Sequence, residues 1–413
     1  LNSGNPIHMV IKNETETLYA GQCKIIKFDS RKRRKHVVLA TLQEAIQRFA
    51  PRRYRSRRIT LTPSPDVVFS HPFSDRLVHL KVIDLSGSGI SVEEDEESAM
   101  LVPGMIVPEM TLNFAGGFHF KCRVQVIYRR MSTGEQNART VQCGIAFLDV
   151  AADDHMKFLS MLHQAENKHL YICNKVDIEQ LWRFFFETGF IYPKKYAFLH
   201  PYKNRILHTY ETLYNRNSNI ARHFTWQQKG SILAHLSMLR FYEKTWLIHH
   251  LAAQSTRRIG AGIDMLDQVG AFTYDSHRLI SNHMEYLICY FRPENRFPNH
   301  FFGGVAENIE NPKACSIDGF VYFHHRKNLK ESALPGSWSL EKPDYDDLAA
   351  LENFYEHHSG GLMLNSLDLL PENDMADRID LAAEYRKLGL TRERRLFALK
   401  KNHRLHAVIM ANI

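Results

Sequence analysis

The first part of the chain alternates short apolar runs with residues that favour turns. Between residues 50 and 150 the runs include LVHLKVIDL, FHFKCRVQVIYRR and TVQCGIAFLDV, and they are separated by Gly, Pro, Ser and Asn. Short runs at this spacing predict an all-β barrel or sandwich of about 100 residues. Residues 153–166 then place Met156, Leu159 and Leu162 at helical spacing, which predicts a helix after the β region.

After residue 166 the pattern of polar and apolar positions becomes mixed. HLYIC predicts a strand, Asp177 and Gln180 predict a helix start, and residues 204–216 predict a second helix. Three strand patterns follow, which are IARHFTWQ, SILAHLSMLRFY and TWLIHHLAAQ. A helix from Ile263, the strand MEYLICYF, a helical segment and the strand IDGFVYFH complete a predicted order of β-α-α-β-β-β-α-β-α-β.

A weak internal repeat extends this pattern towards the C-terminus. KVDIEQLWRFFFETG begins at Lys175, and KPDYDDLAALENFYEHHSGG begins at Lys342. Both stretches read Lys-x-Asp-x-x-x-Leu and lead into an aromatic-rich helix. Because a second helix and a hairpin pattern turning at KNH follow, the C-terminal part is predicted to repeat the opening of the α/β region.

The composition limits the class of protein. The chain has 413 residues, 44% hydrophobic and 24% charged, which is typical of a globular protein of two or three domains. No apolar run is long enough to span a membrane. The six cysteines form no CxxC pair, which favours reduced thiols in a cytoplasm, and no HExxH or similar spacing predicts a metal site. The chain starts at Leu1 instead of Met and ends within a strand-like run, so we expect truncation at both ends.

The net charge of +8 is concentrated in RKRRKH and PRRYRSRR and favours an anionic partner. The second stretch carries an RxxxR spacing with flanking arginines, which are Arg52, Arg53, Arg57 and Arg58. A DxSxxG spacing follows at a predicted strand and its turn, formed by Asp84, Ser86 and Gly89. Arginine runs are often solvated surfaces, and DxSxxG is also ordinary turn chemistry.

Together, however, these residues suit one kind of ligand. Guanidinium groups bind phosphate oxygens in pairs and stack on purines. An acid can accept from the N–H edge of guanine, a hydroxyl can donate to phosphate or ribose, and a glycine permits close approach of the backbone. The set fits a small, doubly anionic ligand that carries guanine better than it fits a long nucleic acid.

Residues from about 50 to 165 resemble a PilZ domain, the bacterial receptor module for cyclic di-GMP. The resemblance rests on the two motifs in order, the closing strand CGIAFLDV and the helix after it. It implies that the arginines hold phosphates and stack on guanines, and that Asp84 and Ser86 bind from the barrel surface. It also implies that the preceding β segment is the domain that often precedes PilZ, joined by a basic linker that clamps on the ligand.

A second set of residues lies at RRIGAG, between a predicted strand and a predicted helix. Its members are Arg257, Arg258, Ile259, Gly260, Ala261 and Gly262. Backbone N–H groups at a helix N-terminus form a site for pyrophosphate. On the motif alone, an ordinary glycine-containing turn is the better interpretation.

The order of elements favours the binding-site interpretation. A β-α-α-β-β-β-α-β-α-β order with a (Q/R)xxGx(G/A) stretch after the fourth strand resembles the GNAT acyltransferase superfamily. The resemblance covers about 168–325 and recurs, truncated, from 339. It implies that acyl-CoA is bound around Gly260 and Gly262, and that the fourth strand offers a backbone donor to the thioester carbonyl. No catalytic residue is assigned. Candidate bases are His249 and His250, expected on opposite faces of the strand, with Cys289 and Tyr290.

We therefore predict a multidomain protein, an all-β PilZ barrel with α/β GNAT-like domains. The predicted segments are 1–48 (end of a small β domain and linker), 49–166 (PilZ-like barrel and helix), 167–330 (GNAT-like domain) and 339–413 (truncated second GNAT-like domain).

Three functions follow from this organisation. The first is a cytoplasmic cyclic di-GMP receptor that regulates an acyl-CoA-dependent N-acyltransferase. The second is a non-enzymatic cyclic di-GMP effector whose C-terminal region contacts a partner protein. The third, a nucleic-acid binder, ranks last because the arginines are concentrated where the small-ligand motif needs them and no known nucleic-acid-binding motif occurs.

Overall fold

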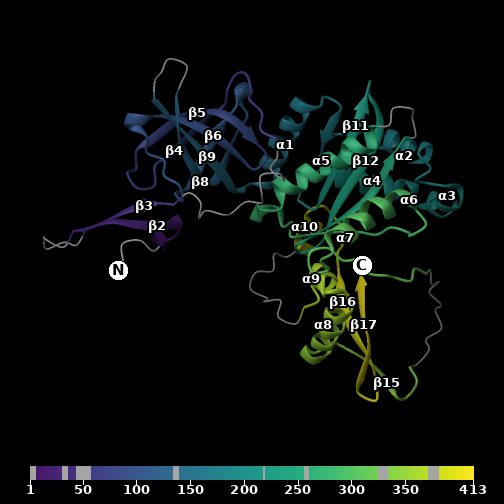
Figure 1. Ribbon diagram of the computed structural model, residues 1–413. Coiled ribbons are helices and arrows are strands. Elements are labelled where there is room, and N and C mark those ends of the chain that lie inside the picture. The colour runs from purple at the N-terminus through teal and green to yellow at the C-terminus, as the bar shows by residue number, and fades with distance from the viewer. Residues whose placement is uncertain are drawn as a thin grey trace.

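The computed structural model of the chain describes residues 6–29, 36–42, 57–133, 139–216, 219–254, 260–323, 334–370 and 381–413. These residues form a small N-terminal sheet, a closed β-barrel, a five-stranded sheet with helices, and a C-terminal unit of three strands with helices (Figure 1). An all-β part followed by mixed α/β parts is the arrangement that the sequence predicts.

The barrel consists of six antiparallel strands in the order β4-β5-β6-β9-β8-β7. Its strands are β4 (Asp66–Ser70), β5 (Leu77–Ser86), β6 (Gly89–Asp95), β7 (Ile106–Asn113), β8 (His119–Thr133) and β9 (Arg139–Val150). Helix α1 (Ala152–Glu166) follows β9 and inserts Phe158 beside Phe114 and Phe120, with ring centroids 5.8 and 5.3 Å away. The predicted helix therefore packs on the barrel core.

The N-terminal sheet has the antiparallel order β1 (Ile7–Lys12), β2 (Thr17–Asp29) and β3 (His36–Thr41). It is attached to the barrel through β2. The backbone N–H of Ala20 donates to the carbonyl of Gly104 at 3.0 Å, and the Gln125 side chain donates to the carbonyl of Ala20 at 3.0 Å. Gly104 has φ +95°, and a Cβ there would lie 2.8 Å from the Tyr19 ring, so this contact requires glycine.

The α/β domain is built on the sheet β10-β11-β12-β13-β14, which is antiparallel except for the last, parallel pair. Its strands are β10 (Leu170–Ile172), β11 (Ala221–Gln228), β12 (Ser231–Tyr242), β13 (Thr245–Ala253) and β14 (Tyr286–Cys289). Its helices are α2 (Ile178–Glu187), α3 (Pro193–Leu199), α4 (Lys203–Asn215), α5 (Ala261–Ser276), α6 (Arg296–Pro298) and α7 (Gly304–Ile309). As predicted, Asp177 caps α2 by accepting from the N–H groups of Glu179 and Gln180.

Two layers of helices cover this sheet. Helices α2 and α4 pack on one face with the buried side chains of Leu181, Phe185 and Leu213. Helix α5 packs on the other face, where Phe272 contacts Phe224 of β11 at 5.1 Å between ring centroids. One continuous buried cluster runs from the barrel interior through α1 to this second face, so the barrel and the α/β domain share a core.

The prediction of a strand at IDGFVYFH is wrong for residues 317–323, the part of this stretch that the structure describes. Residues 316–323 have no regular secondary structure, and Phe320, Val321, Tyr322 and Phe323 are exposed. Apolar and aromatic composition favours a strand, but a strand also needs a hydrogen-bonded neighbour, and among the described residues β14 pairs with β13 alone.

The C-terminal unit has the sheet order β15-β16-β17, antiparallel throughout. Its elements are β15 (Trp338–Glu341), α8 (Tyr345–Ser359), α9 (Leu362–Ser366), α10 (Leu381–Lys387), β16 (Arg394–Lys401) and β17 (Arg404–Asn412). The same sequence of one strand, helices and a hairpin opens the α/β domain. Asp344 and Asp347 form a capping box at the start of α8, in the place that Asp177 takes at α2.

No helix among the described residues has both the length and the hydrophobicity needed to cross a membrane. Within the same residues, no three or more His, Cys, Asp or Glu side chains are grouped so that they could hold a metal ion.

Candidate ligand-binding site

The DxSxxG residues lie at the end of β5 and the start of β6. Asp84 pairs with Ser91 and Ser86 pairs with Gly89 across the two strands, and Gly87 and Ser88 form the turn. A Cβ on Gly89 would lie 2.3 Å from the carbonyl oxygen of Ile145. Gly89 therefore permits close approach, as predicted, but the group that approaches is the neighbouring strand β9.

The segment before the barrel brings an arginine to this motif. Ile59 forms two backbone hydrogen bonds with Leu85, each of 2.9 Å, which fix residues 57–59 beside β5. The Arg58 guanidinium then forms an ion pair with Asp84 Oδ1, and Ser91 Oγ donates to the same oxygen at 2.5 Å. Arg57 points elsewhere, since its side chain is 83% exposed and lies 4.0 Å from Glu166 at the end of α1.

Ser86 is buried inside the turn. Its hydroxyl donates to the Gly89 carbonyl at 3.4 Å and lies 3.4 Å from the Ser88 hydroxyl. Its exposed fraction is 4%. The structure thus brings Arg58, Asp84, Ser86 and Gly89 into one region, with Arg57 directed towards Glu166, while Arg52 and Arg53 lie outside the described residues.

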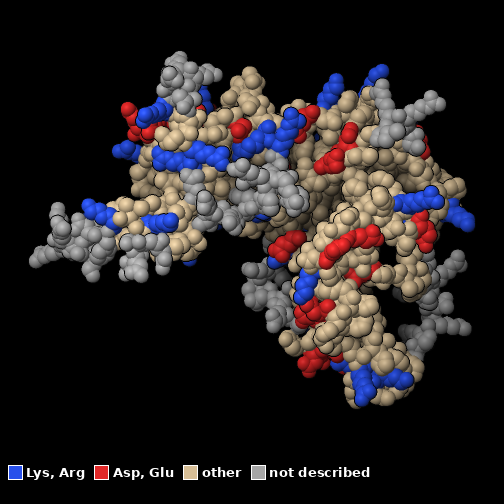
Figure 2. All heavy atoms as spheres, in the orientation of Figure 1, with Lys and Arg blue, Asp and Glu red and all other residues tan. Residues whose placement is uncertain are grey.

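One face of the barrel carries many basic side chains. On the face drawn in Figure 2, lysine and arginine side chains form a band across the barrel and towards its junction with the α/β domain. A basic surface of this kind raises the local concentration of an anionic ligand and its rate of association.

The turn of the motif also packs against the α/β domain, a contact that local sequence patterns do not predict. A Cβ on Gly87 would lie 2.2 Å from Asp275 Oδ2 of α5 and 2.5 Å from the Leu159 side chain of α1. His155 Nε2 lies 3.1 Å from the Gly87 carbonyl, and its Nδ1 lies 3.3 Å from Asn282 Nδ2. Because His155 is fully buried, its pKa is lowered to about 4, and the ring is neutral at pH 7.

His155, Asp275 and Asn282 are therefore the residues that sequence reasoning missed. Each lies in a segment that reads as an ordinary amphipathic element, and periodicity does not report that a buried polar side chain faces another domain. Ser281 strengthens the same junction, since its hydroxyl donates to the Val150 carbonyl at 2.5 Å.

The second predicted set lies at the other end of α5. Gly260 precedes the helix and Ala261 and Gly262 are in its first turn, while Arg257, Arg258 and Ile259 lie outside the described residues. No described side chain caps this N-terminus, which leaves its N–H groups available to an anion. Asp264 in the first turn opposes this, because its carboxylate already complements the helix dipole.

Strands β13 and β14 separate close to this helix N-terminus. Their pairing ends at Ile248 and Cys289, and β13 continues with a bulge in which His250 has φ +53°. The expectation that His249 and His250 point to opposite faces is wrong, because the bulge breaks the alternation and places the two rings 4.2 Å apart.

His250 is held by two tyrosines of α4. Its Nδ1 lies 2.8 Å from the Tyr214 hydroxyl and its Nε2 lies 3.4 Å from the Tyr210 hydroxyl. The Tyr214 hydroxyl donates to Ser237 Oγ at 3.1 Å, so His250 Nδ1 must be the donor to Tyr214, and Nε2 keeps a lone pair. Burial first, and then the neighbouring His249, His235 and Lys195, lower the pKa of His250 well below its usual value.

The other candidate bases are placed less favourably. Burial raises the pKa of the Cys289 thiol to about 11, and Tyr290 is 61% exposed beyond the end of β14. His249 has a pKa lowered to about 4 by burial, and its Nε2 has no hydrogen-bond partner among the residues that the structure describes. Among the four, only His250 combines a fixed tautomer with a position at the strand separation.

Comparison with known proteins gives a mixed result. No protein-family model and no curated protein matches the chain. Among solved structures, the PilZ domain with c-di-GMP of YcgR from Escherichia coli is 22% identical and covers 28% of this chain and 94% of its own, with a TM-score of 0.25. The K. pneumonia MrkH–c-di-GMP complex is 15% identical, covering 41% and 75%, with a TM-score of 0.25.

A third solved structure that resembles part of the chain is that of an enzyme. An aminoglycoside acetyltransferase from an uncultured soil metagenomic sample is 16% identical and covers 39% of this chain and 99% of its own, with a TM-score of 0.26. At these identities and scores the likenesses do not establish a family or a function, and the assignment depends on the residues described above.

Proposed function

We propose that this protein is a bacterial cyclic di-GMP receptor whose ligand binding regulates the α/β region. The observation that carries the proposal is the group formed by Arg58, Asp84 and Ser86 on the barrel, with the RxxxR stretch leading directly into it. The arginine beside β5, and the carboxylate and hydroxyl at the end of β5, are groups of the kinds that bind guanine and phosphate.

Ligand binding is expected to rearrange two existing contacts. The ion pair between Arg58 and Asp84 satisfies both groups, so a phosphate that takes Arg58 leaves Asp84 to accept from a guanine N–H. Arg57, which is largely exposed beside Glu166, is already oriented towards solvent and able to turn to a second phosphate. Arg52 and Arg53 complete the proposed set of cations.

Regulation of the α/β region is supported by the contact between the motif turn and α5. Gly87 touches Asp275, and His155 connects the Gly87 carbonyl to Asn282. A ligand that displaces the turn by even part of an ångström therefore changes the packing at the C-terminal end of α5. Ligand binding shifts the equilibrium between two domain arrangements only if the ligand binds one arrangement more tightly than the other.

We further propose that the α/β domain is a GNAT-like N-acyltransferase and that the C-terminal unit is a second, partial copy. The uncapped N-terminus of α5, the separation of β13 and β14, and the repeated order of strand, helices and hairpin support this. Gly260, Ala261 and Gly262 would hold the pyrophosphate of acyl-CoA. Acyl-CoA would supply the thioester, and His250 Nε2 would accept the proton of the attacking amine.

An effector that acts through protein contacts is the second candidate. Residues 317–323 support it, since Phe320, Val321, Tyr322 and Phe323 expose between 59% and 89% of their surface in one short stretch. Exposed apolar residues in a row are typical of surfaces that bind other proteins. Binding of acetyl-CoA distinguishes the two candidates, because a docking platform has no need of it.

Calorimetric titration of cyclic di-GMP into the full chain tests the receptor function. We expect micromolar or tighter binding in the wild type. The double variant Arg53→Ala, Arg57→Ala and the single variant Asp84→Ala should lose it, whereas Arg404→Ala, an exposed arginine of the C-terminal unit, should not. Absence of binding to the folded wild type would overturn the proposal.

A further inference from the structure

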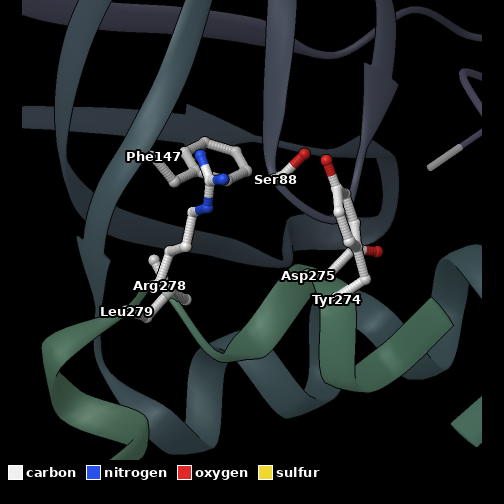
Figure 3. A pocket seen from close by; sticks show the side chains of 6 residues that line it. All are labelled: Ser88, Phe147, Tyr274, Asp275, Arg278 and Leu279. Carbon is white, nitrogen blue, oxygen red and sulfur yellow. The ribbon is translucent and has the colours of Figure 1, made fainter. Parts of the chain in front are cut away.

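A narrow crevice separates the motif turn from α5. It is lined by Ser88 and Phe147 of the barrel and by Tyr274, Asp275, Arg278 and Leu279 of α5 and the residues after it. Figure 3 shows the hydroxyls of Ser88 and Tyr274 facing each other and the Arg278 guanidinium extended beside the Phe147 ring. Side chains of two different domains therefore meet in one space.

This crevice is continuous with the DxSxxG motif. The hydroxyls of Ser86 and Ser88 lie 3.4 Å apart, and the Ser88 carbonyl accepts from the Phe147 N–H at 3.0 Å. Ser86 is buried, while Ser88 is half-buried and opens into the crevice. A ligand group bound at the surface of this turn is therefore close to α5 through Ser88.

The α5 side of the crevice carries the chemistry of nucleotide recognition. Tyr274 and Arg278 are four residues apart, so they share one face of the chain at the end of the helix, and both are half-buried. An aromatic ring stacks on a purine, and a guanidinium pairs with phosphate or with the O6 and N7 edge of guanine. Asp275 between them is 4% exposed and contacts Gly87.

We propose that α5 completes the cyclic di-GMP site, with Tyr274 and Arg278 binding the ligand from the α/β domain. The inference rests on the proposed receptor function and adds a second wall to its site. The crevice has room for only about one water molecule, so the bound ligand widens it and bridges the barrel and α5, and the affinity depends on how closely the turn packs on α5. Because α5 is a single helix of 16 residues, roughly 24 Å long, its other end carries Gly260 and Gly262 to the proposed acyl-CoA site.

The test is calorimetric titration of cyclic di-GMP into four full-length proteins: wild type, Asp84→Ala, Arg278→Ala and Tyr274→Ala. We expect each α5 variant to bind roughly tenfold more weakly or worse, the loss typical of one good contact. Gly270→Ala is the matched control, since it lies in the same helix and, outside the adjacent helix backbone, no described atom lies within 4 Å of the added methyl group. It should bind as the wild type does.

The outcomes separate the two proposals. If the wild type does not bind, the receptor function fails. If Asp84→Ala abolishes binding and both α5 variants bind as tightly as the wild type, the receptor stands and the shared site is overturned. Thermal unfolding of each variant checks folding, and if Arg278→Ala is unfolded, Arg278→Gln and Tyr274→Phe replace the truncations, with the same loss of affinity expected from Arg278→Gln.

Discussion

The two ends of α5 differ in how much of a binding site the chain provides. At the C-terminal end, side chains from several segments surround one turn: Arg58 pairs with Asp84, the hydroxyls of Ser86 and Ser88 lie 3.4 Å apart, and His155 of α1 reaches the Gly87 carbonyl. At the N-terminal end, backbone N–H groups are the main donors and Asp264 competes for them. A site assembled from several segments specifies its ligand, whereas a helix N-terminus alone specifies only an anion.

Alanine substitutions at Gly87 and Gly89 of the motif test this comparison. Gly89→Ala should have the largest effect on stability. Its methyl group would lie 2.3 Å from the backbone oxygen of Ile145, and the barrel wall cannot yield without losing strand pairing. We expect a loss of about 3 kcal/mol or more in the free energy of unfolding, measured by chemical denaturation. A stable Gly89→Ala barrel would contradict the packing described here.

Acid should lower the free energy of unfolding, because the domain junction and the α/β core each contain a buried histidine. His155 at the domain junction and His223 in the α/β core are fully buried, and burial lowers the pKa of each to about 4. The unfolded chain binds protons near pH 6.5, so stability is complete above that pH and falls as the pH drops towards 4, by roughly 3 kcal/mol for each group.

The variant His155→Gln sharpens this prediction. Between pH 7 and pH 4, the free energy of unfolding of this variant should depend less steeply on pH than that of the wild type, because one group that takes up a proton on unfolding is gone. An unchanged pH dependence would show that His155 is not the buried neutral group described here.

Gly87→Ala should act on the junction and spare the barrel. Its methyl group meets the side chains of Asp275 and Leu159, which can move further than a backbone oxygen. We expect a loss of about 1–3 kcal/mol and greater protease sensitivity between the barrel and the α/β domain. Gly270→Ala, on the exposed side of α5, should instead leave stability unchanged or raise it slightly.

Glu166→Gln should have the smallest effect. The contact with Arg57 is 4.0 Å long, and the arginine side chain is 83% exposed, so solvent screens most of its energy. We expect a change of less than about 0.5 kcal/mol in stability. If Arg57 holds phosphate, removing this competing carboxylate should also tighten cyclic di-GMP binding slightly, which calorimetry can detect, and weaker binding would count against that role.

Much of the fold could be read from local patterns. The six barrel strands, the cap at Asp177 and the hairpins of the α/β domain depend on alternation, turn residues and capping chemistry within a few positions of each other. The strand expected at 317–323 depends on a distant neighbour as well, and the pattern carries no information on whether that neighbour is present. The bulge at His250 is similar, since its φ of +53° follows from the pairing of β12 and β13 and from no residue preference.

The candidate site was predictable only on its barrel side. Arg57, Arg58, Asp84, Ser86 and Gly89 belong to two short motifs, and the structure brings all of them but Arg57 together. Their contact with α5 joins residues nearly two hundred positions apart, and neither Gly87 nor Asp275 differs in its local sequence from an ordinary turn or helix residue.

Hydrogen exchange in the full chain tests most directly whether the α/β domain senses the ligand. The measurement compares backbone amides of α5 with and without saturating cyclic di-GMP, and uses α8 of the C-terminal unit as the internal reference. We predict slower exchange in the last turns of α5 and no change in α8, because the ligand ties α5 to the barrel. Saturation of the barrel site with unchanged exchange throughout α5 would contradict the account.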